Sequence, residues 1–309
     1  MKSIMMAMAV VVPLVVYPYV CRTILPEGLG KVNFAQNNVL YFSMLAQLGI
    51  PTYGVRACAQ VRDDRELLSR TVCEILTINV IMTVISYLLF VAGLLLIPQW
   101  REERLLFLVM SVSIVLNTIG MDWLYAGLEQ YGFMALWSVI FNLLMIAGVF
   151  LFVKTPKDYV AYGAVYVLGT LGARIPYFFH LRSLVSLHPS GKLNLKKHWK
   201  AVGIFFAMAV ATTIYTSMDA VMLGFMRGTL ENGYYDAAVK VKMVLVAVVT
   251  SLGVVILPRA SYLLEKGEDQ EFRKISGKAL NFIVDLAMPM CVFFILFARP
   301  SILLLSGPA

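Results

Sequence analysis

Five arginines stand inside long apolar stretches of this chain or at their ends: Arg22, Arg56, Arg174, Arg227 and Arg259. A guanidinium group offers planar, bidentate donors to an anion and keeps its charge in apolar surroundings. An arginine facing lipid at the centre of a helix costs about 2.5 kcal/mol or more, so a retained one is expected to face protein or water. The chemistry that these residues predict is the binding of an anion inside a membrane protein.

Two of these arginines recur at one spacing. The pattern Gly-x-Val-Asn-Phe-Ala from Gly30 returns as Gly-Tyr-Tyr-Asp-Ala-Ala from Gly233, and counting 26 residues from each glycine reaches Arg56 and Arg259. Two copies of one unit, 203 positions apart, are the simplest interpretation.

In that register Arg227 falls within two places of Arg22, so each unit ends its first helix with an outer arginine and its second with an inner one. A cavity between two pseudo-symmetric lobes that holds an anion alternately from either side needs such pairs. The alternative is that Arg56 and Arg259 only anchor helix ends at the inner surface.

Arg174 and Asp122 lie in different apolar runs. Arg174 is expected to pair with Asp122 or Asp219, to extend to the inner surface, or to contact a substrate. Asp122 lies near the inner end of its run, where it either forms hydrogen bonds inside the bundle or lines the pathway.

Composition places the chain in a membrane. Of its 309 residues 60% are apolar and 14% are charged, and the mean hydropathy is +0.79. Apolar runs of about 18 to 25 residues match the length that an α-helix needs to cross a bilayer. Nine such runs are expected, near residues 3–20, 37–54, 72–97, 105–127, 133–153, 159–181, 201–225, 241–257 and 278–298.

Two charged segments follow corresponding runs in the two copies. The sequence predicts an amphipathic surface helix at residues 62–70 and its counterpart at residues 268–273. A short turn is expected at residues 26–31, between the first two runs.

The net charge of +8 is explained by topology. With the N-terminus inside, the inner segments hold 15 Lys and Arg residues and the outer segments hold 10, with Arg174 inside a run. This bias predicts a cytoplasmic N-terminus, and a nucleic-acid partner is not needed to explain the charge. The four cysteines and three histidines lack metal-ligand spacing, so neither a metal nor a cofactor is expected.

The repeat also predicts the lobes. A unit of six helices gives a complete first lobe at residues 1–185 and a second lobe at residues 186–309 with about three helices. A full second unit would reach roughly residue 400 in this register, so the sequence is expected to be truncated.

Several motifs in a consistent order resemble one family. They are Leu-Pro-Glu-Gly-Leu-Gly-Lys-Val-Asn-Phe-Ala-Gln at residues 25–36, Gly-Ile-Pro-Thr-Tyr-Gly-Val-Arg at 49–56, Asp-Trp-Leu-Tyr-Ala-Gly-Leu-Glu at 122–129 and Asp-Ala-Val-Met-Leu-Gly at 219–224. The chain resembles the bacterial polysaccharide transporters, the Wzx-type O-antigen flippases of the MOP superfamily, over essentially its whole length.

This resemblance implies an all-α integral membrane protein with a MATE-like or MOP-like bundle of two lobes around a central cavity. It implies movement of an undecaprenyl-pyrophosphate-linked sugar unit across the bacterial inner membrane, without covalent chemistry and with membrane lipids and polysaccharide polymerase machinery as partners. Related lipid II flippases use cavity arginines near the ends of their first two helices, and Arg22 and Arg56 look like the matching positions.

Two other function classes stay open at this point. A cation or drug antiporter of the same superfamily would depend on Asp122, Asp219 and Asp285 as coupling or gating acids. An integral-membrane polymerase or transferase would show a large outer loop or a constellation of acids and histidines, and no expected loop here exceeds about 20 residues.

Overall fold

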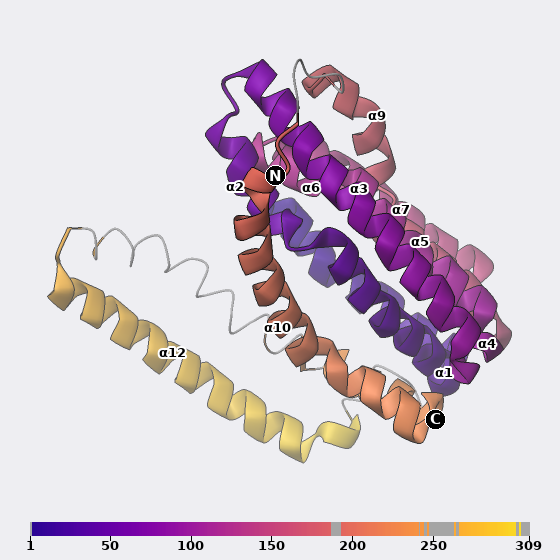
Figure 1. Cartoon of the computed structure of the whole chain (residues 1–309). Helices are drawn as coiled ribbons and strands as arrows, with labels where there is room; N and C mark the ends of the chain where they lie inside the picture. The colour runs from indigo at the N-terminus through magenta and orange to yellow at the C-terminus, as the bar shows by residue number, and fades with distance from the viewer. Residues whose placement is uncertain are drawn as a thin grey trace. The chain divides into compact units, whose positions relative to one another are not determined.

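The fold was analysed in a computed structural model, which describes residues 2–186, 193–240, 242–243, 246, 263, 266–300 and 303. Throughout this part of the chain the regular structure is helical (Figure 1). The helices are α1 (Lys2–Gln47), α2 (Ile50–Gln60), α3 (Arg65–Leu96), α4 (Pro98–Glu102), α5 (Arg104–Gly120), α6 (Asp122–Gly127), α7 (Tyr131–Phe152), the 3-10 helix η1 (Pro156–Asp158), α8 (Tyr159–Leu171), α9 (Arg174–Leu184), α10 (Lys196–Arg227) and α12 (Asp269–Leu296).

Among the described residues, five helical segments are long and apolar enough to cross a membrane: Arg65–Leu96, Arg104–Gly127, Tyr131–Phe152, Lys196–Arg227 and Gln270–Leu296. Large apolar side chains such as Leu88, Leu96 and Phe152 are exposed on these helices, as lipid contact requires. The protein is therefore an all-α, multi-pass membrane protein. Most of the run predicted at 241–257 lies outside the described residues.

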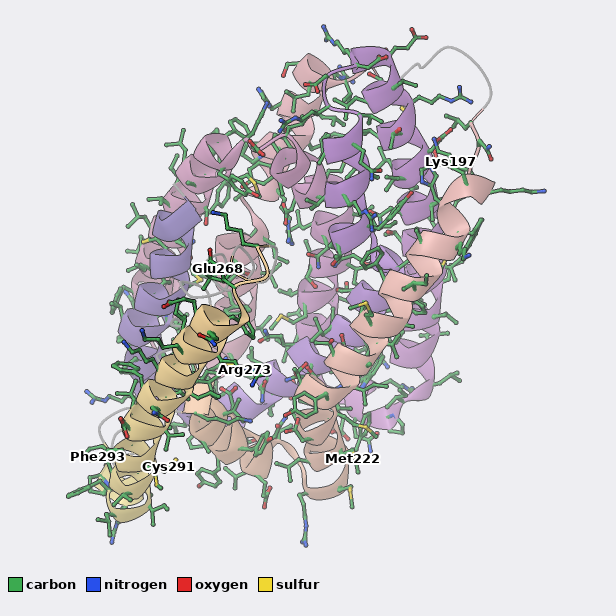
Figure 2. The ribbon with its side chains drawn as sticks, turned by 90° about the vertical axis from the view of Figure 1, so that its left-hand side faces the viewer. Lys197, Met222, Glu268, Arg273, Cys291 and Phe293 are labelled. Atoms are coloured by element: carbon green, nitrogen blue, oxygen red, sulfur yellow. The ribbon has the colours of Figure 1, made fainter. Side chains whose placement is uncertain are left out.

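The chain forms two compact units, Met1–Gly233 and Tyr234–Ala309. The first unit holds α1 to α10, so it combines the predicted first lobe with the first helix after it. The second unit contains α12. Glu268, just before the helix, and Arg273 mark its charged end, and Cys291 and Phe293 lie toward its apolar end (Figure 2). The division into lobes at residue 185 stays a prediction.

The prediction of a turn at residues 26–31 is wrong. These residues are helical, and the interruption within α1 is confined to Leu25, with φ 65° and ψ 166°. Pro26 follows directly, and the first turn of a helix tolerates proline because the N–H group there has no partner within the helix. One residue therefore separates the two halves of α1.

The second predicted run, 37–54, is interrupted as well. Leu48 and Gly49 have φ angles of 46° and 71°, and the short helix α2 begins at Ile50. Four residues spaced along one face of α2 are buried: Ile50, Gly54, Ala57 and Cys58. The C-terminal end of this predicted run is therefore a separate, half-buried helix.

The two predicted surface helices are instead the charged first turns of long helices. Residues from Arg65 onward begin α3, capped by Asp64, whose carboxylate accepts hydrogen bonds from the backbone N–H groups of Glu66 and Leu67 at 2.9 and 3.0 Å. In the second copy, residues from Asp269 onward begin α12, where the residue before the helix, Glu268, makes no side-chain cap. Both copies therefore place charge at the start of a membrane-spanning helix.

Glycines that correspond in the two copies meet in the first unit. A Cβ atom on Gly30 would overlap the carbonyl group of Thr229, and a Cβ atom on Gly233 would overlap the carbonyl group of Pro26. The offset of 203 that relates Gly30 to Gly233 also relates Pro26 to Thr229. Reciprocal contacts of this kind are expected where two copies of one sequence repeat meet around a two-fold axis. They therefore support the repeat.

Polar side chains hold α3 against α1 inside this apolar bundle. The Asn79 amide donates to the Ala46 carbonyl at 2.8 Å, and the Ser86 hydroxyl donates to the Phe42 carbonyl at 2.6 Å. The chain directions are opposite, so α3 returns antiparallel along the second half of α1. This arrangement places one face of α1 toward α5 and α8, where the candidate site lies.

Candidate functional site

Arg174 is the first residue of α9, and it lies where the predicted run 159–181 breaks. Helix α8 ends at Leu171, two residues intervene, and α9 begins at Arg174 with Pro176 in its first turn. The aliphatic part of the Arg174 side chain lies against Gly120, where any Cβ atom would overlap it. Glycine at position 120 thus leaves the space that the arginine occupies.

Asp122 follows a second break, in the run predicted at 105–127. Met121 has φ 46° and ψ 41°, so α5 ends at Gly120 and the short helix α6 begins at Asp122. The two breaks bring the charged side chains together across 52 positions of sequence. Arg174 donates from Nε and Nη2 to Asp122 Oδ2 at 2.8 and 2.5 Å, and its Nη1 donates to Asn117 Oδ1.

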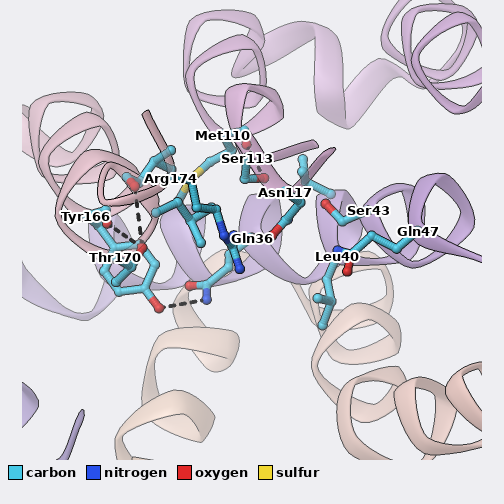
Figure 3. A pocket seen from close by; sticks show the side chains of 13 residues that line it. Gln36, Leu40, Ser43, Gln47, Met110, Ser113, Asn117, Tyr166, Thr170 and Arg174 are labelled. Atoms are coloured by element: carbon cyan, nitrogen blue, oxygen red, sulfur yellow. Dashed lines mark hydrogen bonds between the residues drawn. The ribbon is translucent and has the colours of Figure 1, made fainter. Parts of the chain in front are cut away.

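A pocket of about 360 Å³ opens beside this ion pair. Its lining comes from α1, α5, α8 and α9, and in Figure 3 Arg174, Asn117 and Gln36 face the same hollow. The Gln36 amide donates to the Tyr166 hydroxyl at 3.0 Å across it. The lining residues are Gln36, Val39, Leu40, Ser43, Gln47, Met110, Ser113, Asn117, Tyr166, Val167, Thr170, Leu171 and Arg174.

A second pocket, of about 60 Å³, shares Arg174, Asn117 and Gln47 with the first. Its other lining residues are Ile50, Pro51, Asn79, Asp122 and Trp123. The indole N–H of Trp123 is buried and has no hydrogen-bond partner among the described residues. Arg174 therefore borders both hollows, and Asp122 borders only the smaller one.

The groups at this site can offer hydrogen bonds and one cation to a ligand. The Arg174 and Asp122 charges cancel, while amide and hydroxyl side chains form part of the lining of the larger pocket. A guanidinium group pairs with a carboxylate or with a phosphate through the same planar set of donors. Within the described part of the chain no group of three or more His, Cys, Asp or Glu residues could hold a metal ion.

The other predicted arginines lie away from both pockets. Arg22 on α1, Arg56 on α2 and Arg227 at the end of α10 are all exposed and line neither hollow. Arg259 lies outside the described residues. Their roles in binding stay predictions.

The predicted acids also differ in their surroundings. Asp122 is the partner of Arg174, as one of the alternatives for that arginine foresaw. Asp219 is exposed on α10 and interacts electrostatically with the Tyr41 hydroxyl of α1. Asp285 is exposed on α12, in the second unit.

Sequence reasoning missed Glu74, which is fully buried on α3. Its carboxylate accepts from Lys197 Nζ at 2.6 Å, His198 Nε2 at 2.9 Å, the Asn194 backbone N–H at 2.8 Å and Arg70 Nε at 3.3 Å. The sequence did contain the signal that could have identified it, since Glu74 is an acidic residue inside the apolar run 72–97.

The polar lining of the larger pocket was missed too. Gln36, Ser43 and Gln47 recur along α1, and Ser113 and Asn117 along α5, at spacings that keep each set on one face of its helix. Polar residues at helical spacing inside apolar runs would have indicated a hollow between these helices.

Comparison with known proteins agrees with the motifs. A family model described as "Polysaccharide biosynthesis protein" matches residues 2–264. A protein of Escherichia coli (strain K12), named provisionally as an O-antigen transporter, is 24% identical over 259 residues, which cover 82% of this chain and 61% of the relative.

A protein of Shigella dysenteriae with the same name is 23% identical over 266 residues, covering 81% of this chain and 63% of the relative. The chain thus spans less than two thirds of the length of these relatives. No solved structure matches it. The family match covers most of the chain, and the chain belongs to the polysaccharide biosynthesis protein family.

Proposed function

We propose that this protein is part of a flippase that moves an undecaprenyl-pyrophosphate-linked sugar unit from the cytoplasmic to the periplasmic leaflet of the bacterial inner membrane. The observation that carries the proposal is the amide-lined and hydroxyl-lined pocket around Arg174 inside an apolar helical bundle. The family and the names of the two relatives support it.

The physical need for such a pocket is direct. A pyrophosphate carrying sugars cannot enter hydrocarbon alone, since each charge costs several kcal/mol or more to desolvate. Arginine pairs with phosphate through two parallel hydrogen bonds, and amide groups pair with sugar hydroxyls. The polyprenyl tail stays in the lipid while the head group passes through the protein.

The proposed mechanism is alternating access between two lobes of a MATE-like bundle. The reciprocal contact of Gly30 and Gly233 supports a two-fold relation between these lobes. One state would expose the end with Arg56 and Arg259, and the other the end with Arg22 and Arg227.

The proposed orientation has a cytoplasmic N-terminus. Arg62 and Arg65, both predicted to face the cytoplasm, contact Glu129 and the carbonyl of Ser183, while Lys197 contacts Glu74. These contacts gather basic residues from several segments at one end of the first unit, as the positive-inside rule requires of a cytoplasmic face.

The test is display of surface glycan in a host that depends on the full-length protein. Replacing Arg174 by Gln removes the cation while keeping a polar side chain, and we expect glycan display to fall at least about tenfold. Replacement of Arg22 or Arg56 by Ala is expected to act in the same direction.

Arg101→Gln is the matched control, because Arg101 is exposed on α4 and borders neither pocket. Membrane levels of each variant are measured on blots. Normal glycan display in Arg174→Gln at normal protein levels contradicts the proposal. The proposal is also contradicted if the Arg174→Gln variant loses efflux of cationic dyes while its glycan display is unchanged.

A further inference from the structure

Asp122 already accepts hydrogen bonds from the Arg174 N–H groups that an anion in the larger pocket would use. Two of the five N–H groups of Arg174 point to Asp122 Oδ2 and a third to Asn117. The other two have no partner among the described residues. Because Arg174 borders both hollows and Asp122 only the smaller, an anion in the larger pocket meets the guanidinium that Asp122 already holds.

The carboxylate has more freedom than the arginine. The Asp122 side chain is 37% exposed and that of Arg174 is 19% exposed. Arg174 packs against Gly120, whereas Asp122 begins a helix of six residues after the left-handed Met121. If one partner leaves the pair, Asp122 is therefore the one that can swing away.

Building on the proposed function, we infer that Asp122 is a built-in competitor for the phosphate groups of the substrate at Arg174. The incoming anion displaces the carboxylate, and the carboxylate returns when the anion leaves. The guanidinium is paired in both states, so Arg174 itself is never left without a counter-charge inside the bundle. The competition also weakens binding enough for the cargo to leave, as transport through a site requires.

The inference is tested by calorimetric titration of the purified full-length protein in lipid nanodiscs with inorganic pyrophosphate. We expect Asp122→Asn to bind pyrophosphate about tenfold more tightly than the wild type, a change equivalent to about 1.4 kcal/mol. Arg174→Gln should abolish this gain in the double variant, because the two residues act on one anion. Farnesyl pyrophosphate should show the same ratio if the site recognises the pyrophosphate whether free or attached to a lipid.

Asp63→Asn is the matched control, since it removes one negative charge from a side chain that is 99% exposed. Asp122→Glu keeps the charge and covers the case in which Asp122→Asn fails to fold, and it should bind no more tightly than the wild type. Unchanged or weaker binding in folded Asp122→Asn, or tighter binding in Asp122→Glu than in the wild type, overturns the inference.

This assay separates the inference from the proposed function. Tighter pyrophosphate binding in Asp122→Asn supports the competitor even if glycan display never depends on Arg174, in which case only the flippase proposal fails. Glycan display that depends on Arg174, together with unchanged binding in Asp122→Asn, refutes the competitor alone.

Discussion

Gly120 determines where the side chain of Arg174 can lie. A methyl group at position 120 would overlap Cβ, Cγ and Cδ of the arginine, so Gly120→Ala must push that side chain out of its present position. Extra atoms in a packed region cost about 1 to 3 kcal/mol. We expect Gly120→Ala to reduce glycan display nearly as strongly as Arg174→Gln, with a small loss of thermal stability.

Gly203→Ala is the control for this substitution, because a Cβ atom there would meet nothing within 4 Å. That change should leave glycan display intact and, through helix propensity, add up to about 1 kcal/mol of stability. Normal glycan display in Gly120→Ala would show that the position of Arg174 does not matter for transport.

At the scale of helices, Glu74 joins the start of α10 to α2 and α3. His198 is 1% exposed, and since its Nε2–H donates to Glu74, its Nδ1 accepts from the Tyr53 hydroxyl of α2 at 2.5 Å. Lys197, labelled in Figure 2, adds the closest cation. This network and the apolar packing of Val202 and Phe206 together hold the beginning of α10 against the rest of the first unit.

We expect Glu74→Ala to destabilise the protein by about 3 kcal/mol, because it leaves a buried histidine and two cations without their shared acceptor. The measurement is thermal unfolding in detergent. Glu129→Gln is the control, since the Glu129 side chain is 72% exposed and its pair with Arg62 is worth at most about 1 kcal/mol. Equal midpoints for the two variants would rule out a structural role for the network.

At the scale of the whole molecule, substitutions at Gly30 and Gly233 test whether the two sequence copies are related by a two-fold axis. Alanine favours helices over glycine, so a loss on Gly30→Ala has to come from the overlap with Thr229. If the two copies are related by a two-fold axis, Gly30→Ala and Gly233→Ala should lower thermal stability by similar amounts.

The double variant should cost less than the sum of the single variants, because both substitutions open one contact. Gly277→Ala on α12, where a Cβ atom meets nothing within 4 Å, is the control. Tolerance of either single substitution, or strict additivity, would count against the two-fold contact.

The sequence by itself determined the class of this protein and much of its pattern. Apolar runs identified the spanning helices α3, α7, α10 and α12 because spanning length and side-chain hydropathy are local properties. The repeat register and the family motifs are likewise properties of residue order. Arg174 could be singled out from the sequence because a charge inside an apolar run is costly and is expected to have a partner or a function.

Only the tertiary structure decided which residues meet. The sequence left Arg174 with several partners, and the breaks at Met121 and Gly172 brought it to Asp122, 52 positions away. The partners of Glu74 come from α3, the segment before α10 and α10 itself. Hydrogen bonds and shape depend on atoms distant in sequence, so local hydropathy predicts that a buried charge must be paired but not the residue that pairs with it.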